Sequence, residues 1–136
     1  MEIWHYSCRG SECESYFNYG PTDISEDLME KIDILEKLVP GIEITSGYRC
    51  PVHNALVSGF PTTSRHMNGT CADVTAPGLL SNIRKAVLAA GFESFGVYVN
   101  GGFIHCDTED VGGEWQGDAE YEINGNGDIV REGEVI

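Results

Sequence analysis

Apolar residues recur at helical spacing in an early stretch of the chain, which predicts a helix with one buried face. Ser25 is a good N-cap for this helix, and the acidic residues that follow suit its first turn. Pro40-Gly41 ends it. The predicted buried stripe consists of Leu28, Ile32, Leu35 and Val39.

A second helix is predicted over residues 79–90, with Gly91 as the residue just past its end. Its predicted apolar face consists of Leu80, Ile83, Val87 and Leu88.

Strand patterns occupy the segments between and after these helices. Residues 42–48 open with apolar residues at every second position, and residues 70–74 indicate a turn that leads into a strand. Residues 95–107 predict a hairpin around Asn100-Gly101. The tail after Ala119 predicts one more hairpin, at a sheet edge.

Period two in the second strand of the hairpin separates its side chains into two faces. Phe103, His105 and Asp107 fall on one face, and Ile104 and Cys106 fall on the other. His105 is therefore expected to point toward a site, and Cys106 toward the core.

Composition limits the classes of partner. A length of 136 residues fits one compact domain, residues 1–136, and we expect it to act as a monomer. The net charge of −14 argues against nucleic acid and against an anionic membrane surface as partners, and no apolar run is long enough to span a bilayer.

The N-terminus has neither a basic region nor an apolar one, so we expect no secretory signal. The sequence does not predict where the protein acts. Either it is made in the cytoplasm and released to the cell wall by another route, or the sequence has been trimmed.

The five cysteines are an odd number, so at least one has no disulfide partner within the chain. Cys8 and Cys13 are close enough in sequence for a local disulfide or a small metal site. No partner ligands for such a site are evident, so reduced structural thiols are the favoured interpretation.

Residues suited to binding a metal ion lie in the middle of the chain and in the hairpin. His66 and Asp73 are seven residues apart, and the step from a loop into a strand can bring their side chains together. His105 offers a third ligand. Taken singly, each has an ordinary explanation, His66 as a surface-loop residue and Asp73 as a turn acceptor.

Four motifs in order make a more specific pattern: SGYR, CPxHN, SxHxxGxxxD and FIHxD. Together they resemble the zinc D-Ala-D-Ala carboxypeptidases and L-Ala-D-Glu endopeptidases, and more narrowly the short phage and bacterial subfamily, which includes endolysin-like enzymes. The vancomycin-resistance dipeptidases and the hedgehog signalling domain share that fold. The resemblance covers roughly Trp4 to Trp115 and leaves residues 119–136 outside it. It implies an α+β fold, with a small, mainly antiparallel sheet and helices packed on one side.

The resemblance also implies roles for individual residues. His66, Asp73 and His105 would hold Zn2+ and leave a fourth position for water, which is typical of catalytic rather than structural zinc. Arg49 would stabilise the oxyanion or hold a substrate carboxylate, where the ordinary alternative is a surface ion pair. Ser64 would hydrogen-bond substrate, where the alternative is a turn residue.

One departure from the family pattern concerns the general base. Many relatives carry Glu or Asp three residues before the last zinc histidine, where this chain has Gly102, and some carry histidine two residues before it, where this chain has Phe103. The base is therefore unassigned. Asp107 is expected on the same face as His105, either as the base or as an acceptor that orients His105.

Two functions follow as hypotheses. The first is a zinc-dependent peptidase that cuts peptidoglycan stem peptides, as a D,D-carboxypeptidase or an L-Ala-D-Glu endopeptidase. The second is a non-catalytic zinc-binding module, used for docking to peptidoglycan or as a structural part of a phage particle. The missing base favours the second, whereas Arg49 and the open zinc position favour the first.

Overall fold

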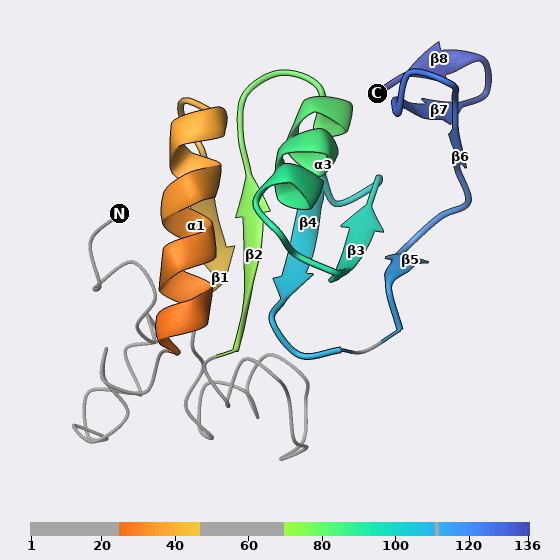
Figure 1. Cartoon of the computed structure of the whole chain (residues 1–136). Helices are drawn as coiled ribbons and strands as arrows, with labels where there is room; N and C mark the ends of the chain where they lie inside the picture. The colour runs from red at the N-terminus through yellow and green to blue at the C-terminus, as the bar shows by residue number, and fades with distance from the viewer. Residues whose placement is uncertain (1–24, 47–69, 111) are drawn as a thin grey trace, which may run out of the picture.

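The computed structural model describes residues 25–46, 70–110 and 112–136, which form two helices and eight strands. The strands form a main sheet and a small C-terminal sheet, and the helices lie together against the main sheet (Figure 1). The helices are α1 (Glu26–Leu38) and α3 (Leu80–Ala89). The strands are β1 (Glu43–Ser46), β2 (Cys71–Thr75), β3 (Ser94–Tyr98), β4 (Phe103–Asp107), β5 (Glu114–Gln116), β6 (Glu122–Ile123), β7 (Ile129–Arg131) and β8 (Glu134–Val135).

Helix α1 begins and ends where the sequence predicts. The side chain of Ser25 accepts a hydrogen bond from the backbone N–H of Leu28, which caps the helix. The stripe is confirmed: Leu28, Ile32 and Leu35 are fully buried, and Val39 is partly buried against the same core.

The main sheet has five strands in the order β1-β2-β4-β3-β5. All neighbouring strands are antiparallel except β3 and β5, which are parallel. The α+β fold with a small, mainly antiparallel sheet is therefore confirmed, and the predicted strand over residues 70–74 is strand β2, which lies between β1 and β4.

Alternation along the strands gives the sheet two chemically different faces. The core face packs against both helices and carries Val74 of β2, Val97 of β3 and Ile104 of β4, each with no exposed surface. Cys106 also lies on the core face, as the sequence predicts. The opposite face carries the neighbouring residues on each strand, His105 among them, so its chemistry does not compete with core packing.

Helix α3 is confirmed, and Gly91 follows it with a left-handed φ of 95°. The predicted apolar face is right for Leu80, Ile83 and Val87. It is wrong for Leu88, which is 48% exposed. Ser81 and Arg84 are buried although they are polar, because each finds a polar partner in the C-terminal segment. That segment packs along the side of α3 which a purely apolar pattern would leave to solvent.

The hairpin of residues 95–107 is confirmed as strands β3 and β4. Its loop spans four residues, 99–102, because Tyr98 pairs with Phe103 and the backbone N–H of Gly102 donates to the Tyr98 carbonyl. Gly102 takes the positive φ of 73° that closes the loop.

The C-terminal tail differs from the prediction. Instead of one hairpin at the edge of the main sheet, it forms two hairpins in a separate three-stranded sheet of order β6-β7-β8 (Figure 1). The second hairpin turns through Glu132 and Gly133, both with positive φ, which is a turn that strand periodicity does not reveal. Among the helices of the described residues, none combines the length and the apolar character needed to cross a membrane.

Candidate metal centre

Four polar side chains gather on the sheet face away from the helices because two adjacent strands pair in one register. Cys71 of β2 lies opposite Asp107 of β4, and Asp73 lies opposite His105. Within each strand the two residues are separated by one position, so all four side chains point to the same face. The antiparallel ladder therefore builds a two-by-two array of one thiol, two carboxylates and one imidazole.

The imidazole of His105 is flanked by a carboxylate at each ring nitrogen. His105 Nδ1 lies 2.9 Å from Asp73 Oδ1, and His105 Nε2 lies 3.3 Å from Asp107 Oδ2. The side chains of His105 and Asp73 are 14% and 17% exposed, whereas that of Asp107 has no exposed surface. Solvent and ligands thus reach the array from the Asp73 side of the ring.

The surroundings of His105 favour positive charge. Burial opposes the charged imidazole, but hydrogen bonds to Asp107, Asp73 and Cys71 outweigh it and raise the pKa of His105 to about 11. A field that holds a proton so firmly is also suited to a bound cation, which would replace that proton on the ring.

Asp107 uses both of its carboxylate oxygens. Oδ2 faces His105, and Oδ1 accepts a hydrogen bond of 2.9 Å from the backbone N–H of Glu109. A buried carboxylate with both oxygens engaged is fixed in orientation and in turn fixes the imidazole ring.

Two arrangements of these donors fit a metal ion. In the first, Asp73 Oδ1 and His105 Nδ1 face a common ion: atoms that each bind one zinc at about 2.0–2.2 Å cannot lie more than about 4.4 Å apart, and these two are 2.9 Å apart. In the second, Cys71, His105 and Asp107 share an ion, since their ligand atoms all lie within 4.8 Å of one another. Imidazole nitrogen, carboxylate and thiolate are all zinc ligands, so donor chemistry is suitable in both.

The sequence-predicted residues divide into those that the structure describes and those that it does not. Asp73, His105 and Asp107 come together as expected from the strand pattern. His66, Arg49 and Ser64 lie outside the described residues. Their part in the site stays a prediction.

Cys71 was not anticipated at the site. No role at the site was predicted for it, although Cys71 precedes Asp73 by two positions on the same strand. The period of two along this strand is the sequence signal that places the thiol beside the carboxylate.

Trp115 of β5 is a second neighbour of His105 whose position beside the site the sequence pattern does not predict. Its indole lies over Gly96 of β3, where a side-chain carbon would come within 2.3 Å of the ring. The rings of Trp115 and His105 are tilted to each other, with centroids 5.6 Å apart. Glycine at position 96 therefore makes the space that brings the indole next to the imidazole.

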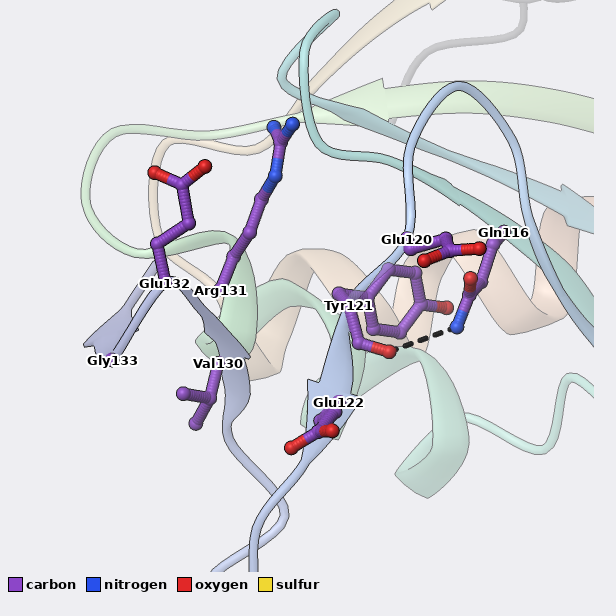
Figure 2. A pocket seen from close by; sticks show the side chains of 8 residues that line it. All are labelled: Gln116, Glu120, Tyr121, Glu122, Val130, Arg131, Glu132 and Gly133. Carbon is purple, nitrogen blue, oxygen red and sulfur yellow. Dashed lines mark hydrogen bonds between the residues drawn. The ribbon is translucent and has the colours of Figure 1, made fainter.

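A hollow lined by described residues lies away from this array. It has a volume of about 750 Å³ and lies beside the C-terminal sheet (Figure 2). The side chain of Gln116 donates to the Tyr121 carbonyl at one side of it, and Arg131 points away from Tyr121 to reach Asn100. Its lining residues are Gln116, Glu120, Tyr121, Glu122, Val130, Arg131, Glu132 and Gly133. None of the four residues of the array lines it, so the array and this hollow are separate features.

Comparison with known families gives one match. The model of the Peptidase M15 family matches residues 8–107, which is most of the chain and includes β2 and β4. No curated protein and no solved structure matches the chain. The resemblance drawn from the four motifs is thus confirmed at the level of the family, and the match ends at Asp107, before β5. This chain belongs to the Peptidase M15 family of zinc-dependent metallopeptidases.

Proposed function

We propose that this chain is a zinc-dependent peptidase that cuts the stem peptides of bacterial peptidoglycan, either as a D,D-carboxypeptidase or as an L-Ala-D-Glu endopeptidase. The observation that carries the proposal is the Asp73–His105 pair, whose ligand atoms lie 2.9 Å apart on adjacent strands within the matched region. Membership of the family supports the reaction class, and the motif resemblance supports the substrate class.

The proposed zinc ligands are Asp73, His105 and His66. We favour the Nδ1 side of His105 because Asp73 is partly exposed there, which leaves room for a further ligand and for substrate. On the Nε2 side, by contrast, Cys71 and Asp107 are buried. When bound, zinc would supply Lewis-acid chemistry, activating a water and polarising the carbonyl of the scissile bond.

Asp107 is proposed as the residue that orients His105. Its two engaged oxygens and its complete burial support this role over that of a general base, which must exchange protons with a reacting water. With Nε2 held by Asp107, His105 presents Nδ1 toward Asp73 in a fixed orientation.

Arg49 and Ser64 complete the proposal on the basis of the motif resemblance. The planar guanidinium of Arg49 would stabilise the developing oxyanion or hold a substrate carboxylate, and Ser64 would hydrogen-bond the substrate.

Synthetic peptides test the proposal and choose between the two activities. Zinc-loaded protein is incubated with a peptide that ends in D-Ala-D-Ala and, separately, with one that contains an L-Ala-D-Glu bond, and the released amino groups are measured. Cleavage of one peptide that stops on addition of a chelator supports the peptidase. Zinc bound at one ion per chain without cleavage of either peptide would favour the non-catalytic zinc-binding module.

A further inference from the structure

Strand β5 brings Trp115 to the site, although it pairs with the rest of the sheet through only three residues. It is an edge strand, parallel to β3, and it lies beyond the region that the family model matches. So short a parallel pair is weak by itself, and the position of the indole must depend on other contacts.

One of these contacts is made by the indole itself, whose Nε1–H donates to the Tyr98 hydroxyl at 3.4 Å, and others come from the opposite face of the same strand. Glu114 precedes Trp115 and therefore points to the helix side, where Arg84 of α3 forms a two-pronged ion pair with it. Arg84 Nε donates to Glu114 Oε2 at 3.0 Å, and Arg84 Nη2 donates to Glu114 Oε1 at 2.7 Å. The guanidinium also lies 5.9 Å from the centre of the Phe95 ring, directly next to Gly96 on β3.

Further hydrogen bonds tie this ion pair to the C-terminal sheet. The hydroxyl of Tyr121 donates to Glu114 Oε2 at 2.6 Å, and Arg84 Nη1 donates to the Gly127 carbonyl at 3.2 Å. Arg84 is 9% exposed, so its charge depends on these acceptors. One buried side chain thus joins α3, β5 and the tail at the residue beside Trp115.

We propose that Trp115 forms a wall of the substrate site next to His105, and that Arg84 is a positioning residue which holds this wall in place through Glu114. The part of the inference that concerns substrate rests on the proposed function. The half-buried indole presents an apolar surface to the group beside the scissile bond, as suits a small aliphatic side chain such as that of alanine. The tail is therefore part of the site and not an appendage to it.

The ion pair of Lys85 with Asp128 provides a matched control. It also joins α3 to the tail, but through Asp128 and not through a residue of β5. The test compares Arg84→Lys, which keeps the charge but cannot form the two-pronged pair, with Lys85→Met. Both are made in a Trp4→Phe background, which leaves Trp115 as the sole tryptophan because the chain has two.

Fluorescence of Trp115 is the readout that does not depend on activity. Arg84→Lys is expected to shift the emission to longer wavelength and to increase quenching by acrylamide at a temperature where the protein is folded. Lys85→Met is expected to leave both unchanged. Equal changes in the two variants, or no change in either, would overturn the positioning role of Arg84.

Gly96→Ala gives an independent displacement of the indole, because the added carbon would lie 2.3 Å from the ring. It leaves the Arg84–Glu114 pair in place, so it tests the wall if Arg84→Lys does not fold. In Arg84→Lys and in Gly96→Ala, KM for a peptidoglycan fragment should rise about 2- to 10-fold with kcat little changed, as expected when a binding contact is lost. An unchanged KM in Gly96→Ala with a displaced indole would rule out the wall. If the parent protein cleaves no fragment, the proposed function fails while the fluorescence result still decides the role of Arg84.

Discussion

Asp73 and His105 face each other across two antiparallel strands, with Asp73 Oδ1 2.9 Å from His105 Nδ1. Their approach is set by strand register, so it needs no loop to close over the site. A shift of one residue in the register of either strand would send that strand's polar side chains to the core face, where apolar packing would be lost. The core on one face therefore fixes the geometry of the candidate metal centre on the other.

The first prediction separates the two possible metal arrangements. Asp73→Asn removes a direct ligand if the ion binds on the Nδ1 side of His105. Loss of a residue that only hydrogen-bonds a ligand lowers metal affinity about 10- to 100-fold, so Asp73→Asn should lower zinc affinity by more than this. Cys71→Ala should keep one zinc per chain. Both are measured by titration of metal-free protein with zinc and by metal analysis.

The opposite pattern would move the ion to the other side of the ring. If Cys71→Ala loses zinc while Asp73→Asn retains it, the ligands are Cys71, His105 and Asp107. His66→Ala extends the test to the third proposed ligand, which should be as damaging as Asp73→Asn.

The second prediction concerns Asp107. Asp107→Asn should weaken zinc binding about 10- to 100-fold and lower turnover at saturating zinc only modestly, because the carboxylate orients His105. A general base would give the reverse: unchanged zinc affinity with turnover reduced by about 10²- to 10⁴-fold. Zinc titration and kcat on the same preparation distinguish the two roles.

The third prediction concerns Arg49. Arg49→Lys keeps the charge but removes the planar fork, and loss of one oxyanion donor typically costs about 2.7–4 kcal/mol of transition-state stabilisation. The expected fall in kcat is therefore about 10²- to 10³-fold, with zinc content unchanged. Near-normal kcat would reduce Arg49 to a surface cation.

The fourth prediction is a pH dependence of stability. Burial opposes the charge of Glu114, but hydrogen bonds from Arg84 and Tyr121 outweigh it and lower the pKa of Glu114 in the folded state. A lowered folded pKa contributes stability above the unfolded value of about 4.3, and that stability is lost as pH falls through the folded pKa.

Thermal unfolding of wild type and Glu114→Gln between pH 7 and pH 3 measures this contribution. The wild type should be the more stable at pH 7, and the difference should shrink as the solution becomes acidic. A difference that stays constant with pH would mean that the Glu114 charge does not contribute.

Much of the fold was accessible from sequence because its signals are local. The cap at Ser25, the stripe of α1 and the Asn100-Gly101 loop each depend on residues a few positions apart. Period two along β4 also placed His105 and Asp107 together on the face opposite Cys106. These are the patterns that a single strand or helix can carry alone.

The failures share a physical cause, which is dependence on distant partners. Arg84 is buried because Glu114 accepts its guanidinium thirty residues later, and no helical period predicts a buried arginine. Leu88, which the apolar pattern placed in the core, is exposed. Strand β5 has three residues and parallel pairing, too little for a periodic signal, so the contact between the Trp115 and His105 rings emerged only in three dimensions.

The most direct test of the account is mass spectrometry of purified peptidoglycan fragments after incubation with zinc-loaded protein. Cleavage at a single type of peptide bond in the stem is predicted, with no cleavage by His105→Ala or in the presence of a chelator. Fragments of unchanged mass, after incubation with wild-type protein shown to hold one zinc per chain, would contradict the account.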